Sequence, residues 1–257
     1  MTEPAPAPTA PASPLHFSRY ECKYVLDGSS RPAVEVGLLP FMRPDERGVV
    51  DAAAGYFVRS LYFDDPALSA FHAKMDGLRT RSKFRLRTYA TGPDDPAACY
   101  LERKGRHDGR VFKHRTLLRQ GFDTRARGDR LVREVLKWAA PSVVRDQFEM
   151  DVVRRRLAPL VLVDYRRCAW HSPLSTDFRV TFDSELRATA SGALWPMQAS
   201  ERTLLRGQSV MEVKFAQLIP AWFHRLAQSR QLQRRSLSKV CEAILELGLA
   251  PDGRSHR

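Results

Sequence analysis

The chain has 257 residues, 43% of them hydrophobic and 28% charged, a balance that excludes a disordered or fibrous protein and allows one large domain. Lys and Arg number 42 against 29 Asp and Glu, and the formal net charge of +13 favours an anionic partner: nucleic acid, an anionic membrane surface or a phosphorylated small molecule. No apolar run approaches the roughly 18 residues of a membrane helix, and the four cysteines lack the spacing of a zinc site, so we expect a reduced, cytoplasmic protein.

The sequence predicts one folded domain between two tails. Residues 1–15 are rich in Pro and Ala and are expected to be disordered, residues 16–250 form the domain, and residues 251–257 form a second disordered tail. Within the domain, short runs rich in Tyr, Phe and Val alternate with a period of two, which is typical of β-strands. In chain order these runs are Phe17–Leu26, Tyr56–Phe63, Lys83–Ala90, Cys99–Lys104, Val111–Leu118, Leu160–Trp170, Phe178–Leu186 and Ser209–Phe215.

Helical patterns lie between and after these strands. Asp65 and Pro66 are typical of the start of a helix. Further helical regions are predicted over Asp129–Leu157, with a break near Pro141, and over Ala221–Leu232 and Ser236–Leu247. About eight strands with helices inserted between them indicate an α+β fold.

Basic residues occupy alternate positions along several of the predicted strands. Because successive side chains of a strand point to opposite sides, Lys83, Arg85 and Arg87 share one face while Phe84 and Leu86 take the other. The same alternation groups further charged residues: Arg19, Glu21 and Lys23; Glu102 and Lys104; Lys113 and Arg115; Glu212 and Lys214. Only eight of the 42 basic residues are lysines, and they fall largely on these faces, which indicates a need for compact point charges.

Two arrangements fit a charged face of this kind. It is either the solvated outside of an antiparallel sheet, or the inside of a closed antiparallel β-barrel of about eight strands, with helices packed on the outside. So many cations could not face one another in a dry interior without a counter-charge. The second arrangement therefore requires a polyanion, and a linear chain of phosphates has the charge and the length to lie in such a charged tunnel.

Eight segments carry a resemblance to a known family. They are RYECKY (Arg19–Tyr24), SLYFDD (Ser60–Asp65), KFRLRTY (Lys83–Tyr89), YLERKGRHDG (Tyr100–Gly109), VDYRRCAW (Val163–Trp170), FRVTFDSEL (Phe178–Leu186), VMEVKF (Val210–Phe215) and SLSK (Ser236–Lys239). In this order, over nearly all of 17–247, the sequence resembles the polyphosphate polymerase domain of the vacuolar transporter chaperone (VTC) complex. That domain belongs to the triphosphate tunnel metalloenzymes.

The resemblance implies a set of residues that point into a tunnel and hold phosphates. Those implied as catalytic are Lys23, Arg85, Arg87, Lys104, Arg167 and Arg179. Those implied as substrate-binding are Lys74, Lys113, Tyr165, Lys214, Ser238 and Lys239. Lys74 is alternatively an exposed helix residue, and Ser238 is alternatively a helix cap. Glu212 matches a metal-binding glutamate that would hold Mn or Mg, or it only balances nearby lysines.

One position departs from the wider superfamily. Its hydrolases and cyclases begin with two glutamates in an ExExK strand, whereas this chain has RxExK, with Arg19 in the first acidic place. Fewer acidic ligands and more cations favour the polymerase branch. Glu21 and Glu102 either assist the metal through water or pair with neighbouring basic residues.

The resemblance implies that the chain is a metal-dependent phosphotransferase, which moves the terminal phosphate of ATP onto a growing polyphosphate chain. ATP and inorganic polyphosphate are the expected partners, and a membrane-protein subunit is a further candidate. The alternatives are a metal-dependent triphosphatase and a non-catalytic module that binds polyphosphate or inositol phosphates. A nucleic-acid binder is not expected, because the basic residues are spread over strands and no helix-turn-helix, RRM or zinc-finger signature appears.

Overall fold

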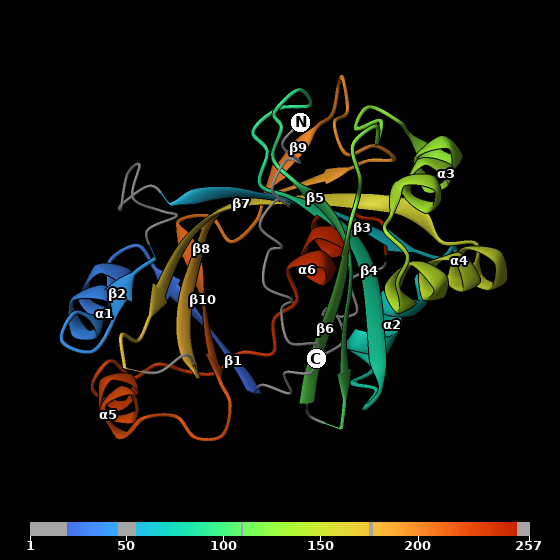
Figure 1. The fold of residues 1–257 in the computed structure, drawn as a ribbon. Coiled ribbons are helices and arrows are strands. Elements are labelled where there is room, and N and C mark those ends of the chain that lie inside the picture. Colours follow the sequence, from blue (N-terminus) through green and yellow to red (C-terminus); the bar gives the residue numbers. More distant parts are fainter. Residues whose placement is uncertain (1–19, 46–54, 109, 175–176, 251–257) are drawn as a thin grey trace, which may run out of the picture.

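The computed structural model describes residues 20–45, 55–108, 110–174 and 177–250, and one antiparallel sheet of ten strands dominates it (Figure 1). The strands are β1 (Tyr20–Asp27), β2 (Arg43–Pro44), β3 (Tyr56–Asp64), β4 (Arg81–Thr88), β5 (Cys99–His107), β6 (Arg110–Leu117), β7 (Ala158–His171), β8 (Phe178–Ala190), β9 (Glu201–Thr203) and β10 (Gln208–Phe215). The helices are α1 (Ser30–Leu38), α2 (Ser69–Met75), α3 (Gly128–Trp138), α4 (Val143–Arg155), α5 (Ala221–Ser229) and α6 (Lys239–Glu246). The predicted tails and Arg19 lie outside the described residues.

The predicted elements are confirmed, with small shifts at their ends. Each predicted strand run corresponds to one of β1, β3 to β8 and β10, and the break near Pro141 separates α3 from α4. Ser142 caps α4, because its hydroxyl accepts a hydrogen bond from the Arg145 N–H at 3.3 Å. Helix α1 was not predicted. It is short and contains Pro32 and Gly37, yet it forms because Val34 and Leu38 are buried against the sheet.

The sheet curls into a half-barrel that stays open, so the prediction of a closed barrel is wrong. Its strand order is β1-β10-β8-β7-β3-β4-β5-β6, and no backbone pairing joins β1 to β6 in the described part of the chain. The physical reason is that another segment of the chain already pairs with the edge of β1 that does not face β10. The Arg235 N–H donates to the Lys23 carbonyl at 2.8 Å, and Arg234 forms a bridge with Tyr24. Whether the curled sheet works as a charged tunnel stays a prediction.

Two apolar clusters hold helices on the convex side of the sheet. Helices α3 and α4 pack on β3 to β5, where the Phe148 ring lies 5.0 Å from Phe63 and 5.3 Å from Phe84. Helices α1 and α5 pack on β1, β8 and β10, with Phe223 buried among the strands. This part of the sequence prediction, helices covering the outside, is confirmed for these four helices.

Helix α6 contradicts that prediction, because it packs on the inside of the curl (Figure 1). Its Val240 and Ile244 belong to a third apolar cluster with Tyr62 and Tyr165, whose hydroxyl groups face the charged side chains of the concave face. The reason is that this part of the concave face is itself apolar, with Val58, Val163 and other buried residues of β3 and β7. The concave face is therefore part apolar and part charged.

Candidate functional site

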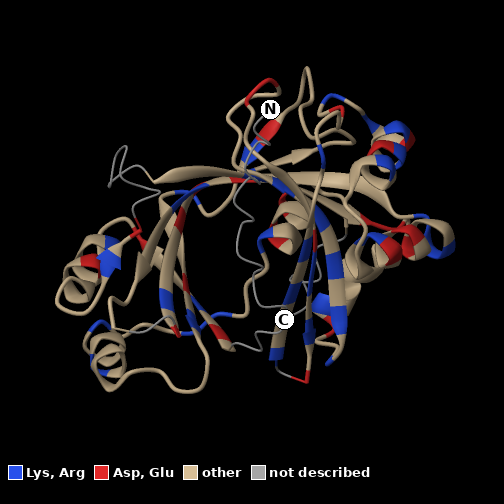
Figure 2. Cartoon of the chain, viewed as in Figure 1, with Lys and Arg blue, Asp and Glu red and all other residues tan. Residues whose placement is uncertain are grey.

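Strand β4 shows how alternation builds the charged face. Phe84 and Leu86 are buried on the convex side, whereas Lys83, Arg85 and Arg87 point to the concave side. Figure 2 shows basic residues repeated along β4, β5 and β6, opposite further charged residues of β1 and β10. The charged side chains of β1 and β5 thus meet across the curl, as the Glu21–Lys104 ion pair shows, whereas Lys113 and Arg115 of β6 are exposed to solvent.

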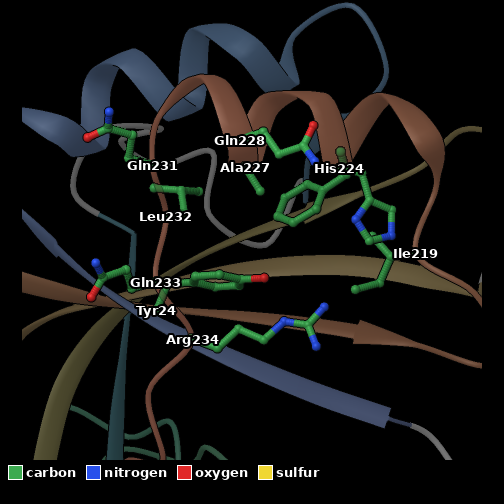
Figure 3. A pocket seen from close by; sticks show the side chains of 10 residues that line it. Tyr24, Ile219, His224, Ala227, Gln228, Gln231, Leu232, Gln233 and Arg234 are labelled. Carbon is green, nitrogen blue, oxygen red and sulfur yellow. The ribbon is translucent and has the colours of Figure 1, made fainter.

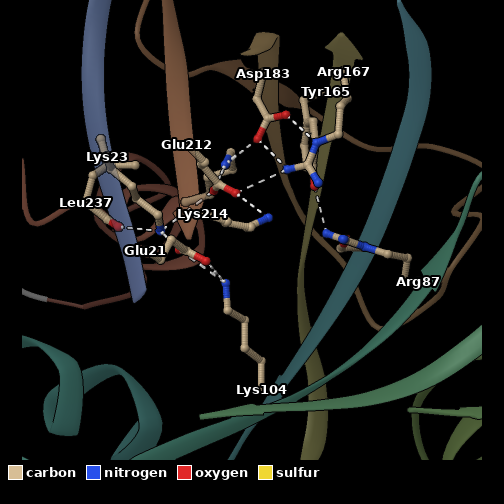
Figure 4. A network of polar contacts seen from close by, with 12 residues as sticks. Glu21, Lys23, Arg87, Lys104, Tyr165, Arg167, Asp183, Glu212, Lys214 and Leu237 are labelled. Atoms are coloured by element: carbon tan, nitrogen blue, oxygen red, sulfur yellow. Dashed lines mark hydrogen bonds and ion pairs between the residues drawn. The ribbon is translucent and has the colours of Figure 1, made fainter. Parts of the chain in front are cut away.

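Two carboxylates form the centre of the charged cluster (Figure 4). Glu212 comes from β10 and Asp183 from the neighbouring β8, and both are buried. The Lys239 ammonium lies 2.7 Å from Glu212 and 2.6 Å from Asp183, and so joins them. Arg167 binds Asp183 through two hydrogen bonds of 2.6 and 2.7 Å, and its other contact with Glu212 is at 3.5 Å.

Glu212 also contacts lysines from two strands, and Glu21 extends the cluster across the curl. Lys214 lies 3.3 Å and Lys23 lies 3.8 Å from Glu212. Glu21 of β1 contacts Lys23 at 3.2 Å and Lys104 of β5 at 3.0 Å. Because β1 and β5 lie near opposite ends of the strand order, these ion pairs connect the two walls of the half-barrel.

A second group of ion pairs lies on the wall formed by β4, β5 and β6, around the carboxylate of Glu102. Glu102 is fully buried, accepts two hydrogen bonds from Arg85 at 2.8 and 2.6 Å, and pairs with Lys113 at 2.6 Å. The remaining arm of Arg85 donates to the Tyr62 hydroxyl at 2.9 Å. Glu102 therefore pairs with neighbouring basic residues, one of the two roles that the sequence left open.

Arg87 connects this wall to β7, and no carboxylate of the described residues pairs with it. Its guanidinium donates to the Ser60 hydroxyl at 3.1 and 3.2 Å and to the Tyr165 hydroxyl at 2.7 Å. The Tyr165 ring in turn lies 5.2 Å from both Arg167 and Lys239. Most of the sequence-predicted residues thus belong to one continuous network around Glu212.

Three predicted residues lie at the margin of this network. Arg179 pairs with Asp45 at 2.8 Å and its side chain is 41% exposed. Lys74 of α2 is exposed to solvent on one side and donates to the Ser236 hydroxyl at 3.0 Å. Ser238 is the N-cap residue of α6 by position, but its hydroxyl makes no capping hydrogen bond and instead accepts one from Lys83 at 3.0 Å.

Asp183 and Tyr62 are central to the network and were missed by the sequence reasoning. Both stand within quoted segments, FRVTFDSEL and SLYFDD, and both share the inward face of their strand with residues of the network. The signal that could have identified Asp183 is its spacing of four residues from Arg179, which places both on one face of β8.

Burial and charge act against each other at these groups. Burial alone would raise the pKa of Glu212, but Lys239, Lys214 and Lys23 hold it well below the ordinary value. The pKa values of Glu21, Glu102 and Asp183 are lowered in the same way by their basic partners, against the effect of burial. For Lys214 burial prevails and lowers the pKa to about 8. The pKa of Lys113 is lowered in the same direction, to about 7, although 40% of its side chain is exposed to solvent.

These lowered carboxyl pKa values predict a loss of stability in acid. A carboxylate whose folded pKa lies below its unfolded pKa contributes stability above the unfolded value and loses it as the pH falls through the folded one. We therefore expect the free energy of unfolding, measured by urea titration, to fall by at least ~2 kcal/mol between about pH 6 and about pH 3. A flat profile over that interval would contradict the network of ion pairs.

Glu212 and Asp183 fit a hard divalent cation. They present carboxylate oxygens close enough for a single lysine ammonium to contact both. Thr181, the cross-strand partner of Glu212, is buried, and its hydroxyl oxygen has no hydrogen-bond partner among the described residues. No group of three or more His, Cys, Asp and Glu suited to a metal occurs in the described residues.

A pocket of about 490 Å³ lies away from this cluster, on the other face of β1 (Figure 3). Tyr24, Phe223 and Leu232 form its apolar part, and Gln228 and Arg234 lie at its rim. Tyr24 neighbours Lys23 in the strand and therefore points away from the charged face. The pocket contains none of the predicted site residues.

None of the described helices is both long and apolar enough to span a membrane.

A search among curated proteins found no match. Solved structures that align with this chain include a Vibrio parahaemolyticus protein described as an adenylate cyclase candidate, at 11% identity and a TM-score of 0.45, covering 86% of this chain and 95% of that one. The PH1819 protein of Pyrococcus horikoshii OT3 aligns at 10% identity and a TM-score of 0.42, over 90% of this chain and 98% of that one. The capping enzyme triphosphatase of Mimivirus aligns at 8% identity and a TM-score of 0.31, over 81% of this chain and 86% of that one.

The comparison with protein families gives a match over most of the chain. The model of the VTC domain matches residues 18–247, which contain the half-barrel, helix α6 and every site residue named above. This match confirms the resemblance found in the sequence. The chain therefore belongs to the VTC domain family.

Proposed function

We propose that the protein is a metal-dependent phosphotransferase that moves the terminal phosphate of ATP onto a growing polyphosphate chain. The observation that carries the proposal is the concave face itself, where basic side chains from both walls outnumber the four carboxylates Glu21, Glu102, Asp183 and Glu212. An excess of buried cations is costly unless an anion lies between them. A chain of phosphates supplies such an anion, and membership of the VTC domain family supports this choice.

We assign the proposed phosphate contacts according to the chemistry of each side chain. Arg87 and Arg167 would bind phosphate oxygens with their planar guanidinium groups, which Tyr165, Ser60 and Asp183 hold in place. The other proposed phosphate contacts are Lys23, Arg85, Lys104 and Arg179 near the reacting phosphates, and Lys74, Lys113, Tyr165, Lys214, Ser238 and Lys239 along the chain. Phosphoryl transfer needs mainly positioning and charge neutralisation, which such a cluster can supply without a covalent nucleophile.

Glu212, with Asp183 beside it, would hold Mg or Mn. The bound metal would neutralise charge on the transferred phosphate. Because lysines surround Glu212 on several sides, a bound phosphate chain would draw some of them away from the carboxylate and leave room for the cation.

The function is tested by incubating the purified protein with ATP and Mn. We expect material that stains as polyphosphate on gels, together with ADP. Free phosphate without polymer would show the triphosphatase alternative. Binding of polyphosphate with no metal-dependent product would show a binding module.

A further inference from the structure

Lys83 differs from the other lysines on the concave face of the sheet. Lys23, Lys104, Lys113 and Lys214 each form an ion pair with a carboxylate. Within the described residues Lys83 forms none: its ammonium donates one hydrogen bond, to the Ser238 hydroxyl at 3.0 Å, and lies 5.6 Å from the centroid of the Tyr62 ring. An ammonium has three donors, so two of them have no protein partner in the described structure.

The groups around Lys83 stabilise its positive charge only weakly. Lys23 of β1 and Lys104 of β5 oppose its charge, whereas Tyr62 of β3 and Cys241 of α6 favour it. Burial lowers the pKa of Lys83 to about 8 despite these two groups. Burial would also raise the pKa of Tyr62, but Arg85, Lys83 and Arg87 bring it down to about 7.

The position of Lys83 matches that of an anion site. Lys83 lies on the same strand as Arg85 and Arg87. Its ammonium donates a hydrogen bond to Ser238, the residue just before Lys239, and therefore lies at the first turn of α6. We propose that Lys83 is a further phosphate-binding residue, whose two free donors contact the substrate chain beside the start of α6. The proposal rests on the proposed function, because it names a contact of the same polyanion.

The test compares three variants for binding of tripolyphosphate, by calorimetry in EDTA so that no turnover occurs. We expect Lys83→Met to weaken binding by about tenfold to a hundredfold, since hydrogen bonds to charged groups are the strong ones. Lys83→Arg keeps the charge and should retain most of the affinity. Lys137→Met is the matched control, because Lys137 is exposed on α3 and lies over the Trp138 ring, outside the site.

Melting curves without ligand separate binding from a structural role. A lysine without a carboxylate partner stabilises the fold little, so Lys83→Met should melt no lower than the wild type. Unchanged affinity together with a lower melting temperature would show that Lys83 only supports α6 through Ser238, and would overturn the inference alone. If the wild-type protein fails to bind tripolyphosphate, the proposed function fails and the Lys83 contact fails with it.

Discussion

Glu212→Gln is expected to lower metal-dependent turnover by at least about 100-fold, because even changes to residues that merely support a metal ligand cost about 10- to 100-fold. The substitution keeps the shape of the side chain but removes a charge that contacts Lys23, Lys214 and Lys239. Binding of tripolyphosphate in EDTA should be unchanged or tighter, because the site becomes more positive. Turnover and calorimetric affinity measured on the same preparation would show the two effects separately.

The same variant should be less stable without ligand and recover when ligand is added. Removing one partner of a buried ion pair costs about 3–5 kcal/mol, because the cations left behind lose their counter-charge. Tripolyphosphate supplies that charge, so its stabilising effect on the melting temperature should be larger for Glu212→Gln than for the wild type. Glu149→Gln removes an exposed charge from α4 and is the control. Retained metal-dependent turnover in Glu212→Gln would rule out the proposed metal ligand.

Glu102→Gln is expected to reduce the free energy of unfolding by about 3–5 kcal/mol. Glu102 is buried and pairs with both Arg85 and Lys113. Arg85 cannot lose its proton, whereas Lys113 can, since burial lowers its pKa to about 7. A lysine with a folded pKa below the unfolded one costs stability as the pH falls. The deficit of the variant, meaning its free energy of unfolding subtracted from that of the wild type in urea titrations, should therefore be larger at about pH 6 than at about pH 9.

Lys113→Met, made alone and together with Glu102→Gln, completes a double-mutant cycle. The pH dependence of the Glu102→Gln deficit should disappear in the double variant, because the titrating group is gone. The deficit itself should also be smaller, since only Arg85 remains without its partner. Equal deficits at both pH values with Lys113 present would mean that Lys113 does not respond to Glu102.

The inward face of each strand could be predicted from the sequence because it depends on local geometry. The period of two in KFRLRTY places Arg85 and Arg87 on one side of β4, and the structure has them there. Sheet closure depends instead on which segment reaches the free edge of β1. That segment, Arg234–Arg235, lies more than two hundred residues after β1 in the chain, and no periodicity in the sequence indicates that the two pair.

The acidic part of the site was harder to predict than the basic part. Lysines are rare in this chain, so their positions were informative, whereas aspartates are common and Asp183 resembled any other strand residue. Asp183 becomes central only because Arg167 of β7 and Lys239 of α6 converge on it in three dimensions. For the same reason the place of α6 inside the curl could not be read from its amphipathic pattern, which gives an apolar side but not the surface that it covers.

The open edge of the sheet has a mechanical consequence. In a closed barrel, strand number and stagger fix the diameter. Here the walls are held together partly by the Glu21–Lys104 contact, an attraction between side chains that ions in solution can weaken. The distance between the two walls is thus not fixed by a closed ladder of backbone hydrogen bonds in the described part of the chain, and it depends on side-chain contacts of this kind.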